Sequence, residues 1–214
     1  MAGDLGVRAA TGAALVALIL ASIWWGPTSY GGLLLLLVVL GAREFESAWR
    51  KAKPSTHPLS RWVLAVVVLT VPAVSLAHMA GIGQVYDPLI PIGWFVLMWT
   101  NDTGAYLAGR TFGRHKLAPR ISPGKTWEGF AGGAILTLAV GCGLAWSGGF
   151  EDGILCAVLV SLLGPPGDLA ESWLKRKAGI KDSGHILPGH GGVLDRFDSH
   201  FFAAPIAAFV LMFF

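Results

Sequence analysis

The stretch WVLAVVVLTVPAVSLAHMA, residues 62–80, contains no Asp, Glu, Lys or Arg. A helix needs about 20 consecutive apolar residues to cross the hydrocarbon core of a bilayer, and this stretch has nearly that length. We therefore predict that it spans a membrane. Comparable apolar runs lie on both sides of it in the chain, at residues 9–25, 31–41, 89–99, 129–146, 153–164 and 201–214.

The composition of the whole chain indicates the same class of protein. Of its 214 residues, 54% are hydrophobic and 14% are charged, and the mean hydropathy is +0.61. Soluble domains carry roughly 25% charged residues, so the composition excludes a soluble globular protein. The sequence predicts an all-α, polytopic transmembrane helical protein with about seven spans.

The basic residues are distributed unevenly between the predicted connections. When seven spans are threaded through a membrane, all 16 Lys and Arg residues fall on one side. The connections on the other side, at residues 26–30, 81–91 and 147–152, contain none. Because basic loops stay in the cytoplasm, we predict a multi-pass protein of the cell (inner) membrane with this side facing the cytoplasm and the C-terminus outside.

Acidic residues reach into the apolar helices in the second half of the chain. Asp102, Asp168 and Glu171 follow apolar runs, and Asp195 and Asp198 precede the last one. Ionisable groups at membrane depth are costly, so they are functional candidates by default. We expect three acidic clusters at the cytoplasmic ends of helices, lining a cytoplasm-facing polar cavity. Residues 1–93 are then N-terminal transmembrane helices and residues 94–214 a catalytic transmembrane region, integrated in one membrane domain.

The segment GDLAESWLKRK, residues 167–177, carries one of these clusters. One face of a helix would hold Asp168, Glu171, Ser172 and Lys175. The two carboxylates on this face suit a hydrated cation, and the hydroxyl and the ammonium group beside them suit a phosphate. A solvated helix surface with a Glu171–Lys175 ion pair would give the same pattern. The PPG at residues 165–167 predicts a break in the helix.

The segment HGGVLDRFD, residues 190–198, carries another cluster. Asp195 and Asp198 are three residues apart and share a helical face. Backbone N–H groups at Gly191 and Gly192 attract anions, and the arginine between the aspartates suits a phosphate. The alternative is an interfacial helix end with snorkelling charges. With Asp168 opposite, the two aspartates favour a metal site, and oxygen ligands favour Mg²⁺ over zinc.

A basic connection, NDTGAYLAGRTFGRHKLAPRISPGKTWEG at residues 101–129, is rich in glycine and proline. Its sequence Gly-Lys-Thr, with the lysine at Lys125, resembles the end of a phosphate-binding P-loop. The full pattern requires a glycine where Pro119 stands and a preceding strand, and we expect no strand here. We reject the P-loop, and the connection is either a basic loop that sets topology or a cradle for a triphosphate.

These features together describe an intramembrane cavity with carboxylates for divalent cations and basic groups for phosphate. The chemistry that fits is phosphoryl or nucleotidyl transfer to a lipid, with metal ions bound to a nucleoside triphosphate. Such reactions depend on positioning and charge neutralisation, so they need no Ser–His or Cys–His nucleophile. A cation or phosphate transporter is the alternative class, but the outer halves of the helices are too apolar for a continuous path.

The segment SWLKRKAGIKDSGHILPGHGGVLDRFDS, residues 172–199, resembles the signature of the CDP-diacylglycerol synthases (phosphatidate cytidylyltransferases). The basic connection and the sequence GDLAES resemble that family as well, so the resemblance covers residues 94–214. The signature positions are filled by Ser172, Lys175, Arg176, Lys181, Asp182, Pro188, His190, Gly191, Gly192, Asp195, Arg196 and Asp198.

The resemblance implies transfer of the cytidylyl group from CTP to phosphatidate, giving CDP-diacylglycerol and pyrophosphate for phospholipid synthesis. It implies Mg²⁺, with K⁺ as an accompanying ion. The implied partners are CTP, the phosphatidate lipid, the bilayer and a second copy in a homodimer, but no nucleic acid. The nearest alternative is a related CTP-dependent lipid enzyme, either a CDP-archaeol synthase or a polyprenol-type kinase.

The resemblance also assigns roles to individual residues. The implied metal ligands are Asp168, Asp195, Glu171 and Asp198. The implied catalytic residues are Asp168, Asp195, Lys175, Arg196, Asp198 and His190. The implied substrate-binding residues are Lys125, Ser122, Ser172, Arg176, Lys181, Asp182, Gly191, Gly192 and Asp102.

Overall fold

The computed structural model describes residues 2–189 and 191–213. Within these residues the chain is mainly helical, with one small hairpin. The elements, in chain order, are α1 (Ala2–Trp24), α2 (Pro27–Ala52), α3 (Pro58–Met79), α4 (Leu89–Phe112), β1 (Lys116–Ala118), β2 (Ser122–Thr126), α5 (Trp127–Trp146), α6 (Gly153–Lys177), α7 (Leu194–Phe197) and α8 (His200–Leu211).

The strands β1 and β2 form an antiparallel hairpin, with Lys116 opposite Thr126 and Ala118 opposite Ser122. The carboxylate of Glu128 accepts hydrogen bonds from two backbone N–H groups at the base of the hairpin and fixes it there. The prediction of a mainly helical fold is confirmed, with this short hairpin added to the helices. The expectation that no strand precedes the Gly-Lys-Thr sequence is wrong, because β1 lies ahead of it. The P-loop pattern still lacks its first glycine.

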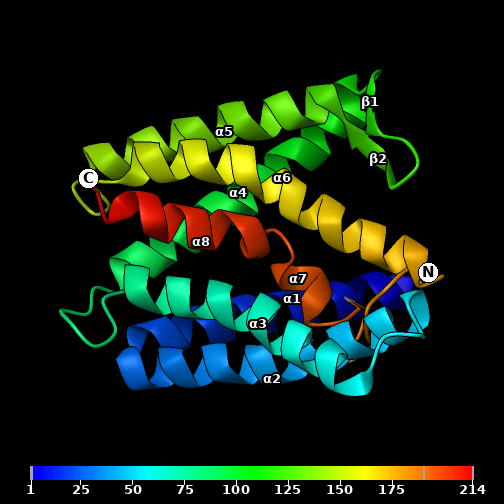
Figure 1. Cartoon of the computed structure of the whole chain (residues 1–214). Helices are drawn as coiled ribbons and strands as arrows, with labels where there is room; N and C mark the ends of the chain where they lie inside the picture. The colour runs from blue at the N-terminus through cyan, green and yellow to red at the C-terminus, as the bar shows by residue number, and fades with distance from the viewer. Residues whose placement is uncertain (1, 190, 214) are drawn as a thin grey trace.

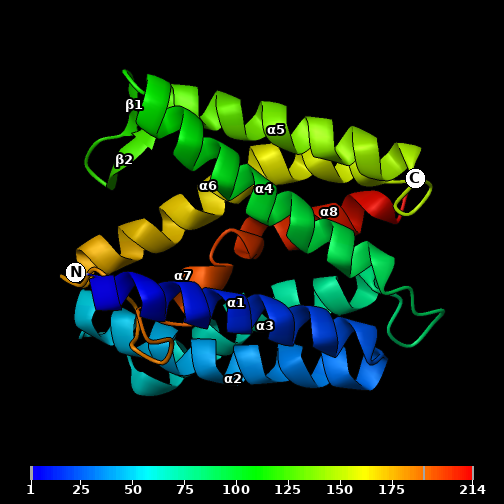
Figure 2. The same ribbon diagram turned by 180° about the vertical axis from the view of Figure 1, so that it is seen from behind.

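The long helices lie side by side, as Figures 1 and 2 show from opposite sides. Helices α1, α2 and α3 form one group, α5, α6 and α8 another, and α4 runs between them. The α2–α3 loop, the hairpin and the end of α6 lie at the same end as the N-terminus, and the α3–α4 loop lies at the opposite end with the C-terminus. The basic connections are thus gathered at one end, as their sequence predicted.

Four helical segments are long and apolar enough to cross a membrane among the described residues: Gly6–Trp24, Pro58–Met79, Trp127–Trp146 and Gly153–Lys177. Helices α2 and α4 have similar lengths but contain more polar residues. Helix α8 has 12 residues, or about 18 Å, which is well short of a bilayer core of about 30 Å. The prediction of apolar, membrane-type helices is confirmed, and the count of about seven spans stays a prediction.

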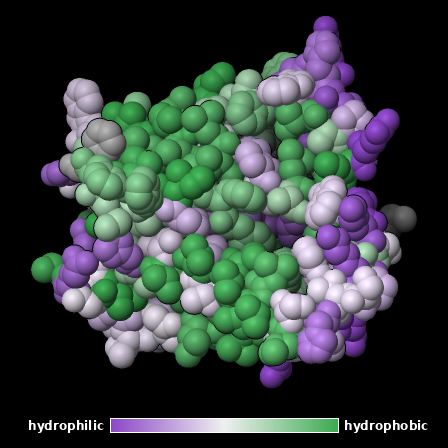
Figure 3. Space-filling model, in the orientation of Figure 1, coloured by the Kyte–Doolittle hydropathy of each residue, from purple (hydrophilic) through white to green (hydrophobic). Residues whose placement is uncertain are grey.

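The surface of the molecule is apolar over a broad region. Figure 3 shows hydrophobic residues across most of one face, and hydrophilic residues gathered at the end that carries the hairpin and the N-terminus. Large side chains such as Leu35, Val74 and Ile135 point outward. Soluble monomers rarely expose apolar patches of this extent, so this surface suits contact with lipid.

Small residues bring α4 and α5 into close contact. A side chain at Gly133 of α5 would meet the backbone oxygen of Asn101, 2.8 Å away, and one at Gly104 of α4 would meet the Cα of Gly133 at 3.1 Å. Small residues serve this purpose in membrane helices, where backbones that approach closely gain van der Waals contact. The contact holds the polar residues of α4 in a fixed position.

Helix α6 continues through Pro165 and Pro166 without ending. It changes direction along its length in both ribbon views, as expected for prolines that remove backbone hydrogen bonds. The predicted break is therefore wrong, because the helix bends instead. Helix α4 likewise continues from Asp102 to Phe112 and α6 from Asp168 to Lys177. These two aspartates lie within their helices, and not at the helix ends as predicted.

Candidate active site

Asp168 and Lys125 form an ion pair between α6 and the hairpin. The Nζ atom of Lys125 in β2 lies 2.6 Å from Oδ2 of Asp168. The hydroxyl of Ser172, one turn further along α6, donates a hydrogen bond of 3.2 Å to the other oxygen of Asp168. The two charged side chains are 26% and 31% exposed, so the pair remains accessible. The hairpin thus delivers the lysine of the Gly-Lys-Thr sequence to the acidic face of α6.

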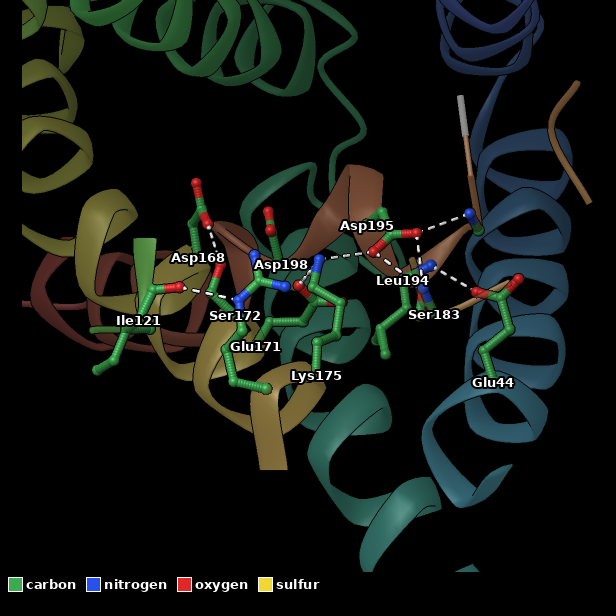
Figure 4. Close-up of polar contacts among 12 residues, drawn as sticks. Glu44, Ile121, Asp168, Glu171, Ser172, Lys175, Ser183, Leu194, Asp195 and Asp198 are labelled. Atoms are coloured by element: carbon green, nitrogen blue, oxygen red, sulfur yellow. Dashed lines mark hydrogen bonds and ion pairs between the residues drawn. The ribbon is translucent and has the colours of Figure 1, made fainter. Parts of the chain in front are cut away.

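Lys175 connects α6 to α7. Its ammonium group forms an ion pair with Glu171, and its Nζ atom lies 2.7 Å from Oδ1 of Asp195 (Figure 4). The side chains of Lys175, Glu171 and Asp195 are 13%, 1% and 5% exposed. Buried charges are tolerated where they are paired, so one lysine here compensates two carboxylates. The residues predicted to share a face of α6 therefore act as two pairs, Asp168 with Ser172 and Glu171 with Lys175.

The carboxylate of Asp195 also accepts hydrogen bonds from the backbone ahead of α7. Its Oδ2 atom accepts from the N–H of Gly192 at 2.8 Å and from that of Ser183 at 3.0 Å. Burial raises the pKa of Asp195, but the hydrogen bonds from Lys175 and from these N–H groups outweigh it, so the pKa lies below its ordinary value. Asp195 is therefore ionised at neutral pH.

A cavity of about 430 Å³ lies between α4, the hairpin, α5 and α6. We call it the hairpin cavity. Its polar lining includes Asp102 and Arg110 from α4, Ser122 and Lys125 from β2, and Asp168 from α6. Its volume lies within the range of about 300–1,000 Å³ that is typical of small-molecule sites. Basic and acidic groups thus face each other across a space large enough for a ligand.

A second cavity, of about 280 Å³, adjoins α7. We call it the central cavity. One part of its lining is charged and the other part is apolar. The charged residues are Asp102, Asp168, Asp195, Arg196 and Asp198, and the apolar residues include Leu15, Val16, Ile19, Phe95 and Trp99. Asp102 and Asp168 line both cavities, so an acidic wall is common to the two.

The carboxylates around the central cavity do not form a closed metal site. Among residues 2–189 and 191–213, no group of three or more His, Cys, Asp or Glu side chains is arranged to hold a metal ion. Asp168 is paired with Lys125, and Asp195 with Lys175. Asp198 accepts a hydrogen bond of 2.7 Å from the N–H of Ser199. The donors are nevertheless all oxygens, the type that Mg²⁺ prefers.

Other predicted site residues lie further out or have a different contact. Arg176 is exposed, and its Nε donates a hydrogen bond of 3.2 Å to the backbone oxygen of Ile121 in the hairpin. Lys181 and Asp182 are exposed and line neither cavity. Gly191 has a φ of 83°, and a Cβ there would lie 2.7 Å from Oδ2 of Asp195, so its close approach is to a carboxylate. The predicted His190 lies outside the described residues.

Sequence reasoning missed Glu44 of α2. Its side chain is buried, with the residue 6% exposed, and its Oε2 accepts a hydrogen bond of 2.8 Å from the N–H of Leu194, the first residue of α7. The available signal was an acidic residue that directly follows the apolar run at residues 31–41. Arg43 and Glu46 beside it made an interfacial cluster the simpler interpretation.

The fold and the site define a class of protein: a helical membrane protein with an acidic cavity beside a basic hairpin. The model of the cytidylyltransferase family matches residues 55–214, and the chain belongs to this family. It is 49% identical to a phosphatidate cytidylyltransferase of Staphylococcus haemolyticus over 122 residues, or 55% of this chain and 47% of that protein. For phosphatidate cytidylyltransferases of Staphylococcus aureus and Staphylococcus epidermidis the identities are 48% and 47%, with the same shares. The chain spans about half the length of these curated relatives.

Proposed function

We propose that this chain transfers the cytidylyl group of CTP to phosphatidate and so produces CDP-diacylglycerol and pyrophosphate. The observation that carries the proposal is the acidic wall shared by the two cavities. One cavity is bordered by Lys125 and Arg110, and the other by Arg196 together with an apolar lining. Two anionic substrates, one of them a lipid, would meet at such a wall.

The hairpin cavity suits the nucleotide. A triphosphate needs several cationic contacts, and Lys125 and Arg110 border the cavity together with the hydroxyl of Ser122. The central cavity suits the lipid, because Arg196 is placed to bind a phosphate monoester while Phe95 and Ile19 would contact an acyl chain. With CTP in the hairpin cavity and phosphatidate in the central cavity, the phosphate groups of the two substrates approach each other beside Asp102 and Asp168.

The proposed reaction needs little more than alignment. An anionic oxygen of the phosphatidate phosphate attacks the α-phosphorus of CTP and forms a new P–O bond. The bond from that phosphorus to the oxygen bridging to the β-phosphate breaks, and pyrophosphate leaves with the electron pair. Because the attacking oxygen is already ionised, no general base is required. Lys125 and Arg110 would offset the negative charge carried by the leaving group.

We also propose that Mg²⁺ takes part. Asp168 and Asp198, with Asp102 beside them, are the residues that would hold it, because their oxygens border the same cavity. Bound there, Mg²⁺ would neutralise phosphate charge and orient the triphosphate. Asp195 and Glu171 are weaker candidates because Lys175 already pairs with both. K⁺ stays a prediction from the family resemblance.

We further propose that the chain crosses the bacterial inner membrane several times, with the end that carries the hairpin in the cytoplasm. The basic connections at that end support this orientation through the positive-inside rule. It would also place the hairpin cavity on the side where CTP is available. The count of about seven spans and the homodimer remain predictions.

The test of the proposed function is cytidylyl transfer by the purified chain in detergent micelles that contain phosphatidate. With CTP labelled on the α-phosphate and Mg²⁺ present, we expect label in the lipid phase as CDP-diacylglycerol, with one pyrophosphate released per lipid. Absence of a labelled lipid under these conditions would contradict the proposed function.

The same assay separates the alternative enzymes. A polyprenol-type kinase would transfer label to lipid from CTP labelled on the γ-phosphate, and would leave the α-label in CDP. A CDP-archaeol synthase would transfer the α-label to an ether-linked archaeal lipid phosphate in preference to the diacyl lipid. We expect the α-label to move, with the diacyl lipid as the better acceptor.

A further inference from the structure

Glu44 lies in α2, outside both the family match at residues 55–214 and the catalytic half of the chain. Yet its side chain reaches the segment that carries Asp195. Its Oε2 accepts the hydrogen bond from the N–H of Leu194, and the whole residue is 6% exposed. Figure 4 shows this contact on the opposite side of α7 from Lys175. A carboxylate is therefore buried at the junction between the N-terminal helices and the site.

The segment ahead of α7 is shaped around the Glu44 carboxylate. A Cβ atom at Gly184 would collide with Oε1 and one at Gly192 would lie 2.5 Å from Oε2. The hydroxyl of Ser183 would also lie 2.6 Å from that Cβ at Gly192. The backbone therefore approaches the Glu44 carboxylate closely at two glycines, Gly184 and Gly192. A residue with a side chain would not fit at either position.

The same segment holds Asp195 on its other side. The N–H groups of Ser183 and Gly192 donate to the Asp195 carboxylate, and the N–H of Leu194 donates to Glu44. The backbone ahead of α7 therefore donates hydrogen bonds to both acids, from Gly192 to Asp195 and from Leu194, two residues later, to Glu44. Any displacement of this backbone away from Glu44 would change the position of the Asp195 carboxylate and of its partner Lys175.

We propose that Glu44 is a positioning residue for the site: it fixes residues 183–184 and 192–194 against α2 and so sets the position of Asp195 at the central cavity. Glu44 lines neither cavity and acts through the backbone. The inference rests on the proposed function for its activity test, but it also makes a prediction about the segment itself. It assigns to α2 a role in the site, in addition to the apolar residues that α1 contributes to the central cavity.

The activity test compares three variants with the unmodified chain. Glu44→Ala removes the acceptor for the N–H of Leu194, and we expect kcat for cytidylyl transfer to fall about 10- to 100-fold, with the KM for CTP changing less than kcat. Glu44→Gln keeps an acceptor oxygen and should restore kcat to within about threefold of the unmodified value. The control is Glu46→Gln, because Glu46 pairs with the buried Arg61 at 3.1 Å and glutamine keeps an oxygen that can accept this hydrogen bond. Its kcat and KM should stay unchanged.

A second test does not depend on activity. Trypsin cleaves after Lys181, which is exposed and lies two residues ahead of Ser183. We expect Glu44→Ala in detergent to accelerate this cleavage at least about tenfold, while cleavage at Arg120 in the hairpin keeps its rate. Glu46→Gln should alter neither rate. If Glu44→Ala yields no folded protein, Glu44→Asp carries both tests, because it withdraws the carboxylate by one methylene group.

The outcomes are distinguishable. A wild-type chain without cytidylyl transfer overturns the proposed function, and the trypsin rates then decide the role of Glu44 alone. Unchanged cleavage after Lys181 in both Glu44→Ala and Glu44→Asp overturns the positioning role. If Glu44→Gln loses as much activity as Glu44→Ala, the hydrogen bond from the N–H of Leu194 is not the basis of the positioning role.

Discussion

At the scale of single residues, Lys175 has the most demanding environment of the site. Its ammonium group pairs with both Glu171 and Asp195. Because both carboxylates are almost fully buried, removal of the lysine would leave two like charges close together without the ammonium between them. Breaking a buried pair from one side costs far more than an exposed pair is worth.

We therefore predict that Lys175→Ala lowers the free energy of unfolding by about 3–5 kcal/mol. Lys177→Ala is the matched control, two residues further along the same helix. Lys177 is exposed and stacks on the ring of Trp173 at 4.6 Å, a contact worth about 0.5–1 kcal/mol. Denaturant unfolding in detergent measures both variants. Equal losses would show that the buried pairing is not the stabilising feature.

Asp168 offers a prediction for activity instead of stability. Asp168→Asn keeps the size of the side chain and can still accept the hydrogen bond from Ser172, but it loses the charge that faces both cavities. We expect cytidylyl transfer to fall about 100-fold or more, which is the effect of removing one preorganised electrostatic group. Glu151→Gln, on the exposed α5–α6 connection, should keep full activity. Comparable activity of the two variants would remove Asp168 from the site.

The residues of the site were largely predictable one at a time, because charge inside an apolar sequence is a strong signal. Asp102, Asp168 and Asp198 were found in this way, and the structure brings them to one cavity. Their pairing was not predictable. Nothing in local spacing shows that Lys125 would meet Asp168, since the two are 43 positions apart in the chain, with all of α5 between them. Glu44 was missed because its partner, Leu194, is 150 residues away.

At the scale of elements, the contact between α4 and α5 sets the shape of the hairpin cavity. Both helices contribute lining residues, Asp102 from α4 and Gly129 from α5, so their separation fixes the width of that space. The contact depends on the absence of a side chain at Gly133, where a Cβ would approach the backbone and side-chain oxygens of Asn101 at 2.8 and 3.0 Å.

Gly133→Ala should therefore destabilise the protein by about 1–3 kcal/mol, the usual cost of overpacking. Gly143→Ala tests the same substitution on the same helix, where a Cβ would meet nothing within 4 Å. Alanine is the better helix former by about 1 kcal/mol, so this control should match or exceed the stability of the unmodified chain. Thermal unfolding of the two variants measures the difference. Similar melting temperatures would contradict the close contact.

The boundaries of elements were harder to predict than their presence. Apolar runs marked where helices lie, but α4 and α6 extend well past theirs, through Asp102 and Asp168. A polar residue ends an apolar run without ending a helix when it faces a cavity. The hairpin was missed because its strands have only three and five residues, and β2 contains proline and glycine, which are depleted in strands.

At the scale of the whole molecule, the sidedness of charge is the feature that the sequence predicted best. Each Lys and Arg was assigned to one side from loop composition alone, and the connections that carry them lie at one end of the structure. Topology follows from a sum over many residues, so errors at individual helix ends do not affect it.

Labelling of single cysteines measures this sidedness. In a background with Cys142 and Cys156 replaced by alanine, Gly124→Cys places a thiol in the hairpin and Glu151→Cys places one in the α5–α6 connection. A maleimide that cannot cross membranes should label only Glu151→Cys in intact spheroplasts, and only Gly124→Cys in inverted vesicles. Labelling of both from the same side would contradict the proposed orientation.

The ion pair between Lys125 and Asp168 has a consequence for the order of events at the site. At a separation of 2.6 Å, each group is the other's counterion, so an anion that binds Lys125 must displace a carboxylate. A cation that binds Asp168 removes that competition in advance. The two ligands therefore assist each other's binding by the same factor, as linkage requires. Nucleotide affinity measured by titration should rise with Mg²⁺ concentration even when no lipid acceptor is present.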